Sequence, residues 1–401
     1  MSHDVIVIGA RCAGSPTAML LARAGCKVLL VDSATFPSDT LSTHLVHPPG
    51  VSALARWGLL DRLLSTGCPP IDTYAFDFGP FTLAGQPGTP QSPLSYAPRR
   101  TVLDKLLVDA ASEAGAQVRE GYTVERLIVD DGRVTGVVGG SKGGRSSSEA
   151  ARFVVGADGR HSLVARTVRP DEYHTRAPLC CAYYSYWSGL PMQGRFEAYV
   201  RPQRAFAAWP THDDLTLVIG GWPFAQLADQ KSDIEGNCLK MFELAPQFAE
   251  RMRSARRETR FLAAAVHNYF RKPYGPGWAL VGDAGYNKDF ITAQGIQDAF
   301  RDAQLCATAL REALSGASAF DDAMARYQRS RDAGVFPMYE FTCDFARLEP
   351  PPPELERLLL AMRGNRSAMD GFARVNAGVT SPSDFFSEQN TAQILADAAA
   401  S

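Results

Sequence analysis

Apolar residues near the start of the chain form two short runs with a helix-like pattern between them. Residues 5–8 (VIVI) are apolar throughout and stop at Gly9, and residues 27–31 (KVLLV) stop at Asp32. Between these runs, residues 13–24 carry apolar side chains at helical spacing and end at Gly25. Because short continuous apolar runs are typical of strands buried on both faces, the pattern predicts a strand–helix–strand unit in a parallel sheet.

Similar elements return later in the chain. Residues 102–114 predict a helix, and residues 126–138 predict a hairpin that turns at Asp131-Gly132. The Gly- and Ser-rich stretch 139–149 (GGSKGGRSSSE) predicts a flexible, exposed loop. Further strands are predicted over 153–155 and 278–281, and helices over 295–315 and in the tail after residue 330.

The segment from about residue 170 to 265 has a different pattern, with aromatic residues in alternating stretches such as 181–187 and 204–209. Alternation of this kind predicts an antiparallel sheet with two unlike faces. Only about half of its aromatic side chains are therefore expected to face a pocket. The candidates for that wall are Tyr183, Tyr184, Tyr186, Trp187, Phe206, Trp209 and Trp222.

Composition excludes several classes of protein. The chain has 401 residues and a formal net charge of -2, so no charge excess points to nucleic acid, and a small molecule is the expected partner. No apolar stretch is long enough to predict a membrane span. The eight cysteines show no metal-binding spacing, which predicts no metal site and favours a reducing, cytoplasmic location.

The loop after the first predicted strand carries candidate chemistry. Residues Gly9, Arg11, Cys12, Ala13 and Gly14 belong to the stretch GARCAG, which keeps the outer glycines of the GxGxxG fingerprint but has Arg11 in the middle. The helix N-terminus behind this loop offers free N–H groups to a pyrophosphate. Asp32 stands at the end of the second strand, where an acid commonly binds the ribose of adenosine. The loop thus predicts a dinucleotide, without separating NAD from FAD.

Two later motifs resemble those of class A flavoprotein monooxygenases. Residues 156–162 (GADGRHS), which contain Asp158, are similar to the DG motif of that family, and the stretch that begins with Gly282-Asp283 is similar to its GD motif. The resemblance implies FAD as the cofactor. It implies that Asp283 binds the ribityl chain, and that the helix beginning at Gly295 and Ile296 points its N-terminus at the isoalloxazine.

The resemblance covers residues 3 to 310 and has departures. Arg100, in Arg-x-x-Leu-Asp at the head of a helix, resembles a family arginine near the flavin phosphates. Phe290 stands where the family has Pro, Ala293 stands where it has Gly, and Arg11 replaces a glycine. The positions of Phe290 and Ala293 lie close to the flavin ring in the resembling family.

The expected fold class is α/β, a Rossmann-like FAD-binding domain with an inserted, mainly antiparallel β-sheet substrate domain and C-terminal helices. The expected discontinuous FAD-binding domain consists of residues 1–70, 99–168 and 266–330. The substrate domain consists of residues 71–98 and 169–265, and residues 331–401 form a helical region whose role no motif indicates.

The resemblance implies a monooxygenase that uses NADPH or NADH and inserts one atom of O₂ into a small aromatic or polyketide-like substrate through a flavin C4a-hydroperoxide. The same set of FAD-binding motifs occurs in flavin-dependent halogenases and geranylgeranyl-reductase-like proteins, so these reactions are alternatives. A non-catalytic flavin-binding protein is a further alternative. The Trp-x-Trp-x-Ile-Pro signature of tryptophan halogenases is absent from the sequence. Catalytic residues stay unassigned. His44 and His47 are candidate polar groups of the pocket, and Lys288 is a candidate functional lysine as an alternative to an ordinary solvated one.

Overall fold

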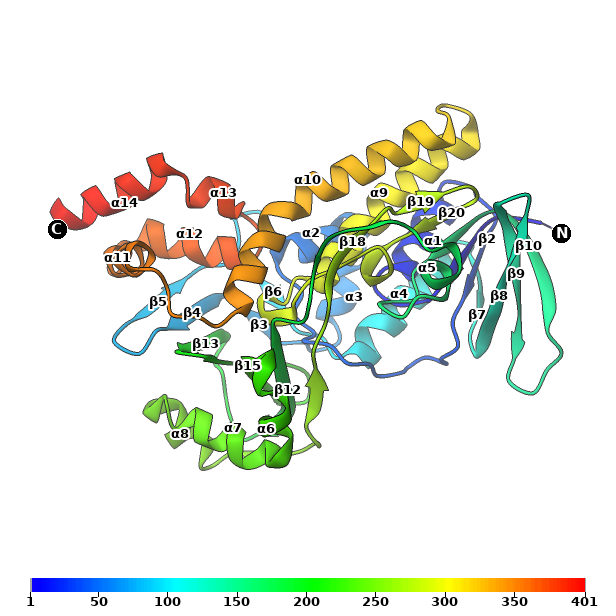
Figure 1. Cartoon of the computed structure of the whole chain (residues 1–401). Helices are drawn as coiled ribbons and strands as arrows, with labels where there is room; N and C mark the ends of the chain where they lie inside the picture. The colour runs from blue at the N-terminus through cyan, green and yellow to red at the C-terminus, as the bar shows by residue number, and fades with distance from the viewer. Residues whose placement is uncertain (1, 401) are drawn as a thin grey trace.

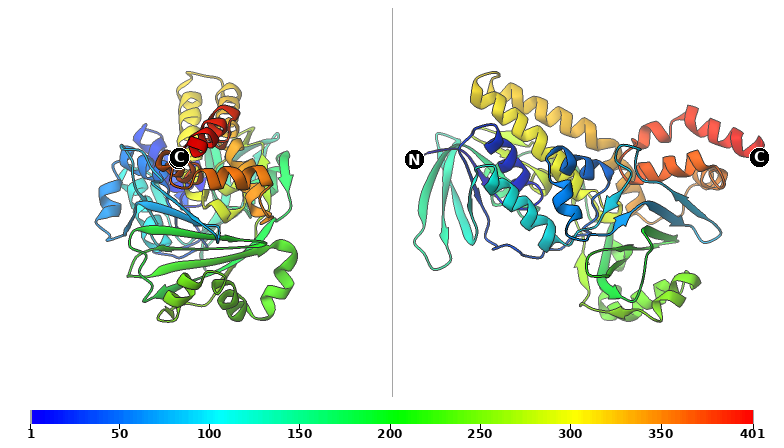
Figure 2. Two further views of the ribbon diagram at one scale, coloured as in Figure 1. Left: turned by 90° about the vertical axis from the view of Figure 1, so that its left-hand side faces the viewer. Right: turned by 180° about the vertical axis from the view of Figure 1, so that it is seen from behind.

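The computed structural model describes residues 2–400. The molecule is elongated, and the two ends of the chain lie at its opposite extremities (Figure 1). A large, mainly parallel sheet lies toward the N-terminal end, a second, mainly antiparallel sheet lies toward the middle, and a group of helices forms the C-terminal end (Figures 1 and 2). The predicted α/β fold is confirmed.

The large sheet has the strand order β19-β20-β10-β1-β2-β7, with β9 paired to β10 and β8 paired to β9. The strands β20, β10, β1, β2 and β7 run parallel. Its strands are β1 (His3–Ile8), β2 (Val28–Val31), β7 (Gln117–Arg119), β8 (Tyr122–Asp130), β9 (Arg133–Ser141), β10 (Ser147–Gly156), β19 (Tyr274–Gly275) and β20 (Trp278–Leu280).

The parallel sheet is buried on both faces. Val5 and Val7 of β1 pack with helices α1 (Gly14–Arg23), α4 (Arg100–Glu113) and α9 (Gly295–Ser315). The alternate residues Ile6 and Ile8 pack with β8, β9 and the short helix α5 (Leu163–Val168). The two-sided burial explains why these strands appear in the sequence as continuous apolar runs.

The second sheet has the order β16-β12-β15-β14-β13-β4-β5, with β17 paired to β12. Its pairs are antiparallel except for β13 with β4. Its strands are β4 (Thr73–Asp77), β5 (Thr82–Gly85), β12 (Cys180–Ser188), β13 (Arg195–Arg201), β14 (Arg204–Pro210), β15 (Thr216–Pro223), β16 (Arg256–Arg257) and β17 (Leu262–Ala264). Two small sheets contain β11 (Glu172–Arg176), β18 (Asn268–Arg271) and β21 (Tyr286–Asn287), and β3 (Pro70–Ile71) and β6 (Ser95–Tyr96).

The two faces of the second sheet separate its aromatic residues. Tyr184, Tyr186 and Trp209 join a core shared with the C-terminal helices. The other candidates for the pocket wall pack on the opposite face, against helices α7 and α8: they are Tyr183, Trp187, Phe206 and Trp222. Alternation thus places three of these seven side chains on one face of the sheet and four on the other.

The remaining helices lie outside the two large sheets. They are α2 (Pro48–Arg56), α3 (Leu60–Leu64), α6 (Leu227–Ser232), α7 (Ile234–Phe242), α8 (Pro246–Met252), α10 (Phe320–Ala346), α11 (Pro353–Ala361), α12 (Arg366–Asn376), α13 (Pro382–Phe385) and α14 (Glu388–Ala400). Short 3₁₀ turns occur at Phe224–Gln226, Gly282–Ala284 and Phe290–Thr292.

Two local predictions are wrong. Residues 139–149 were expected to form a loop, but β9 and β10 extend into them and pair, for example Gly139 with Ser147, so that only a short turn separates the strands. Cross-strand pairing overrides the Gly- and Ser-rich composition there. The aromatic segment also contains helices α6 to α8, which the strand pattern did not predict.

The C-terminal helices are fixed to the second sheet by a close backbone contact. A Cβ atom added at Gly85 of β5 would lie 2.3 Å from the carbonyl oxygen of Met369 in α12. Phe76 of β4 also packs on Phe372 of α12, with ring centroids 5.1 Å apart. The sheet edge and α12 therefore form one packed unit.

We expect Gly85→Ala to lower the free energy of unfolding by about 1 to 3 kcal/mol, because the added methyl group overpacks this contact. Gly334→Ala is the matched control, since Gly334 is exposed in α10 and the nearest atom to its added Cβ is 3.8 Å away. That helical substitution should stabilise the protein by about 0.5 to 1 kcal/mol. Urea unfolding followed by circular dichroism measures both effects, and a Gly85→Ala protein as stable as wild type would contradict the contact.

Candidate cofactor and substrate site

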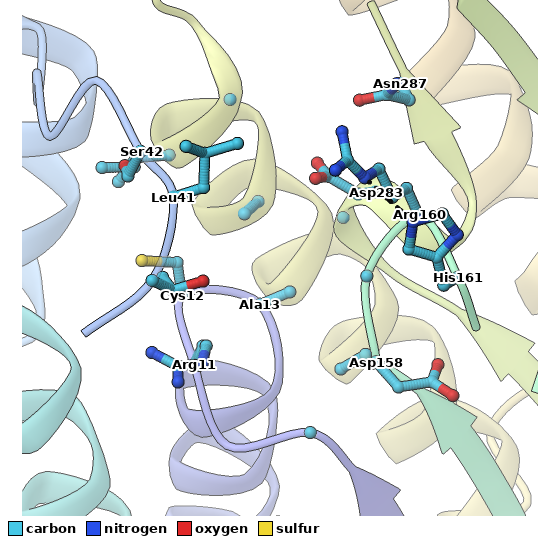
Figure 3. A pocket seen from close by; sticks show the side chains of 18 of the residues that line it. Arg11, Cys12, Ala13, Leu41, Ser42, Asp158, Arg160, His161, Asp283 and Asn287 are labelled. Carbon is cyan, nitrogen blue, oxygen red and sulfur yellow. Dashed lines mark hydrogen bonds between the residues drawn. The ribbon is translucent and has the colours of Figure 1, made fainter. Parts of the chain in front are cut away.

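A cavity of about 690 Å³ lies where the loops after β1, β2, β10 and β20 meet the N-terminus of α9 (Figure 3). Most of the residues proposed from the sequence line it: Gly9, Arg11, Cys12, Ala13, Asp32, Arg100, Asp158, Gly282, Asp283, Lys288, Gly295 and Ile296. Gly14, His44 and His47 do not line this cavity. The structure thus brings segments from four distant parts of the sequence to one place.

The loop after β1 depends on two glycines. Gly9 has a φ of 101°, and a Cβ atom on it would lie 2.4 Å from the carbonyl oxygen of Ala157. At Gly14 a Cβ atom would lie 1.7 Å from the carbonyl oxygen of Gly9. No residue described in the structure accepts a hydrogen bond from the backbone N–H groups of Cys12 and Ala13. These two donors are available to an anionic group in the cavity.

Asp32 is held at the carboxyl end of β2 by backbone donors. One carboxylate oxygen accepts a hydrogen bond from the Ala10 N–H at 2.7 Å, and the other accepts from the Ala34 N–H at 2.8 Å. These bonds fix the carboxylate beside the loop after β1. Its remaining lone pairs are available for hydroxyl groups in the cavity.

Arg11 and Arg100 bind the same buried carboxylate. Asp104 of α4 accepts from an Arg11 nitrogen at 2.6 Å and from Arg100 Nε at 2.9 Å. Its side chain is fully buried, and it also accepts from the Cys12 thiol at 3.5 Å. Burial raises the pKa of Cys12 to about 12, so its thiol is protonated at neutral pH. Arg11 in the fingerprint therefore connects the first loop to α4.

Asp158 stabilises its own turn. One carboxylate oxygen accepts from the Leu163 N–H at 2.7 Å, at the start of α5, and Ser162 caps the same helix. The other oxygen is buried without a partner among the described residues. Burial raises the pKa of this carboxyl group above its ordinary value.

Asp283 differs, because its carboxylate faces the cavity. Within residues 2–400 the carboxylate has no hydrogen bond or ion pair. Burial raises the pKa of Asp283, and the positive charges of Arg100 and Arg160 oppose that shift. The side chain is exposed only in the sense that the cavity admits solvent. It is the acidic group of the site most available to a ligand.

Buried partners fix the backbone around Asp283. The Tyr269 hydroxyl donates to the Asp283 carbonyl oxygen at 2.6 Å, and Asp302 of α9 accepts from the Gly282 N–H at 3.1 Å. Burial raises the pKa of Asp302 to about 7. The turn is thus held from two sides, and sequence analysis did not identify either partner.

The N-terminus of α9 opens onto the cavity. The N–H groups of Gly295 and Ile296 have no partner within the described part of the chain, and space is open beside the Gly295 Cα. The chain enters this helix through Ala293, which has a φ of 53°. Ala293 thus has a left-handed backbone conformation, at a position where the family that this chain resembles has glycine.

Lys288 is buried rather than solvated, which corrects the alternative of an ordinary solvated lysine. Its side chain is 4% exposed, forms an ion pair with Asp298 and lies over the ring of Tyr286. Arg301 donates to the other oxygen of Asp298 at 2.8 Å. Burial lowers the pKa of Lys288, and the Asp298 carboxylate opposes that shift.

Both candidate histidines are buried and bound to tyrosines. His44 contacts the Tyr186 hydroxyl, and burial lowers its pKa well below the ordinary value. Nδ1 of His47 lies 2.6 Å from the Tyr74 hydroxyl oxygen, and Nε2 lies 3.1 Å from the Thr292 carbonyl oxygen. Since a carbonyl only accepts, Nε2 carries the proton and Nδ1 accepts from Tyr74.

A smaller cavity of about 60 Å³ adjoins the larger one. The two share four lining residues: Thr43, Ile219, Phe290 and Ala293. His47 lines the smaller cavity, with Trp209 and several other apolar side chains. Phe290 and Ala293 thus border both cavities, and the smaller cavity has the more apolar lining.

Comparison with known proteins identifies the family. Residues 2–342 match the family model described as FAD binding domain, and the chain belongs to this family. It is 27% identical over 346 residues to digeranylgeranylglycerophospholipid reductase 2 of Methanopyrus kandleri, covering 82% of each chain.

Solved structures show the same fold. The myxobacterial chondrochloren halogenase CndH matches with a TM-score of 0.80 and 23% identity over 99% of this chain and 96% of that one. PqsL, a probable FAD-dependent monooxygenase of Pseudomonas aeruginosa, matches with a TM-score of 0.74 and 21% identity over 95% and 100%. These likenesses show the fold, and the family model places the chain among FAD-dependent oxidoreductases.

The residues of this site fit an FAD. The carboxylates of Asp32 and Asp283 can accept from ribose and ribityl hydroxyl groups. The free N–H groups of Cys12 and Ala13 suit phosphate oxygens, and those of Gly295 and Ile296 suit acceptor atoms of the flavin ring. No cluster of three or more His, Cys, Asp or Glu residues able to hold a metal ion occurs in the described part. Across the same residues, the helices are all too short or too polar to cross a bilayer.

The burial of His47 predicts a pH effect on stability. Burial lowers its pKa from 6.5 to about 4, so between these values the unfolded chain binds a proton that the folded protein does not. Wild type should therefore lose stability relative to His47→Gln as the pH falls from 6.5 to 4. The expected loss is up to about 3 kcal/mol. Urea unfolding at pH 7 and pH 4.5 measures it.

The comparison with a variant is needed because other groups act in the opposite sense. Burial raises the pKa of Asp289 to about 6 and that of Asp302 to about 7, so their protonation favours the folded state as pH falls. Both contributions are common to wild type and variant. His267→Gln, at an exposed position, serves as the control. A stability difference for His47→Gln that is equal at the two pH values would contradict the neutral, buried histidine.

Proposed function

We propose that this flavoenzyme is a monooxygenase that uses NADPH or NADH as reductant and transfers one atom of O₂ to a small aromatic or polyketide-like molecule. The observation that carries the proposal is the apolar cavity that adjoins the larger one at Phe290 and Ala293. Oxygen transfer from a reduced flavin needs a site from which water is excluded, and an apolar lining supplies this condition.

We assign the cofactor residues as follows. FAD, when bound, supplies the redox chemistry, and the protein supplies binding and orientation. Asp32 would accept from the adenosine ribose, and the N–H groups of Cys12 and Ala13 would bind the pyrophosphate. Asp283 would accept from the ribityl hydroxyls, and Gly295 and Ile296 would direct their N–H groups to the flavin ring. Asp158 and Arg100 would support this site by holding loops in place.

No side chain is assigned to a chemical step. His47 and Lys288 have their polar atoms bound to protein partners, which supports positioning roles for them. His44 contacts Tyr186 through Nε2, while its Nδ1 is buried without a partner among the described residues. Lys288 is the candidate closest to the cofactor, since it alone of the three lines the larger cavity.

The proposed division of the chain has support from strand pairing. Residues 1–70, 99–168 and 266–330 contribute the parallel sheet and the helices on it, and they would form the FAD-binding domain. Residues 71–98 and 169–265 contribute the second sheet and would form the substrate domain. The eight unpaired cysteines support a reducing compartment such as the cytoplasm.

Saturation of an isoprenoid double bond is the second candidate function. The 27% identity to a digeranylgeranylglycerophospholipid reductase over 82% of the chain favours it. Halogenation has the support of the fold shared with CndH.

Asp283→Ala should weaken FAD binding by about 10- to 100-fold, because a hydrogen bond to a charged group contributes about 1.5 to 3 kcal/mol. Titration of the apoprotein with FAD measures this, and Asp283→Asn, which keeps an acceptor oxygen, should lose less. The matched control is Asp229→Ala on the exposed side of α6. Equal FAD affinity for Asp283→Ala and Asp229→Ala would contradict the assigned role.

Turnover with NADPH or NADH should stop without oxygen, and the product should carry one oxygen atom derived from labelled O₂. Mass spectrometry of products formed with ¹⁸O₂, and under anaerobic conditions, decides among the three reactions. Anaerobic formation of a product heavier only by hydrogen would favour the reductase. A chloride-dependent gain of mass would favour the halogenase.

A further inference from the structure

The smaller cavity exists because small residues interrupt a sheet face that is otherwise bulky. In the register of the second sheet, Ala198 of β13 pairs with Ala207 of β14, and Ala205 pairs with Gly221 of β15. All four line the smaller cavity. The row beside them holds large side chains, including Trp209, which is 2% exposed. The small residues therefore set the depth of the hollow.

Three polar side chains that line this cavity, those of His47, Tyr74 and Thr292, already bind protein partners. The Tyr74 hydroxyl donates to His47 and lies 2.8 Å from the Ser95 hydroxyl, while His47 Nε2 donates to the Thr292 carbonyl. The Thr292 hydroxyl lies 2.8 Å from that of Thr342. A substrate thus finds little hydrogen-bonding capacity left on this wall, and contact with it is effectively apolar.

The cavity also lacks a charge that would compensate a charged substrate. Its lining, as far as the structure describes it, contains no Lys, Arg, Asp or Glu, and burial lowers the pKa of His47 to about 4, which keeps it neutral. Asp289 does not line the cavity, and its carboxylate accepts at 3.2 Å from the thiol of Cys180, which does. Lys288 lines only the larger cavity and is paired with Asp298. A charged group in the smaller cavity would lose its hydration without gaining a partner.

The C-terminal helices supply part of the wall. Phe345 of α10 and Asn376 of α12 line the smaller cavity, and both lie beyond residue 342, where the match to the family model ends. The Gln294 side chain donates to the Asn376 carbonyl oxygen at 2.8 Å, which connects α12 to the turn before α9. This part of the wall therefore belongs to the chain's own tail.

We propose that the substrate enters the smaller cavity with an uncharged, apolar end, and that α10 and α12 close that cavity and limit its size. The proposal rests on the proposed function, because it takes the smaller cavity to be the place of the reacting end. Specificity then comes from shape, through Ala198 and Ala207 on the sheet side and Phe345 on the tail side.

The test uses FAD-loaded protein and three probes with the same ring: toluene, benzoate and benzylammonium. Binding is measured from the change in the flavin absorption spectrum and from the thermal unfolding midpoint. We expect toluene to bind about 100-fold more tightly than either ion, because the ions must lose their hydration. Benzoate or benzylammonium bound as tightly as toluene, or no binding of toluene, would overturn the proposal.

Variants locate the binding in the smaller cavity. Ala198→Leu and Ala207→Leu should each weaken toluene binding by about tenfold or more, because the added side chain fills the hollow. Ala263→Leu, on an exposed position of β17 in the same sheet, is the matched control and should bind toluene as wild type does. Phe345→Ala should improve the binding of butylbenzene relative to toluene, because it enlarges the smaller cavity on the tail side. This variant serves as the test if the leucine variants do not fold.

The outcomes separate this proposal from the proposed function. Unchanged toluene binding in folded, FAD-loaded Ala198→Leu, Ala207→Leu and Phe345→Ala proteins would refute the apolar subsite, even where turnover still requires oxygen. Conversely, oxygen-independent turnover together with the expected probe binding would refute the monooxygenase and leave the apolar subsite in place.

Discussion

The site depends on the parallel order of β20, β10, β1 and β2. Since parallel strands end at the same edge, the loops that follow them meet there, whatever their separation in the sequence. The approach of two of these loops is very close: Gly9 packs against the backbone of Ala157 with no room for a side chain. This contact determines the position of the loop after β1 relative to the one after β10. The larger cavity lies beside this contact between the two loops.

Buried charges around the cavity are paired so that few of them face a ligand. Asp104 binds both Arg11 and Arg100, and Asp298 binds both Lys288 and Arg301. Removing one member of such a pair leaves a buried charge, which is costly, so these groups stabilise the fold around the cavity. Asp283 is the exception, since its carboxylate has no protein partner among the described residues. The contrast supports a ligand-binding role for Asp283 and supporting roles for the paired residues.

Much of the fold could be predicted from the sequence, because the buried parallel strands and the glycine-bounded loop leave strong local patterns. The loop at Gly9 was proposed for the same reason, whereas the segments at Asp158 and Asp283 were proposed from their resemblance to family motifs. Asp302 and Tyr269 were missed because their contacts with the turn at Gly282 and Asp283 are set by tertiary packing, which has no local pattern. The sequence left Lys288 open between a functional lysine and an ordinary solvated one, because the burial of its charge depends on Asp298, ten residues away.

The tail after residue 330 shows most clearly why local patterns are insufficient. Its helices are amphipathic, but the sequence does not indicate which surface they cover. In the structure they pack on the second sheet, and they reach the turn before α9 through Thr342 with Thr292 and through Asn376 with Gln294. That turn carries Ala293, which lines both cavities. A shift of α10 or α12 must therefore move the wall between the larger and the smaller cavity, and this contact makes the tail part of the site rather than an appendage to it.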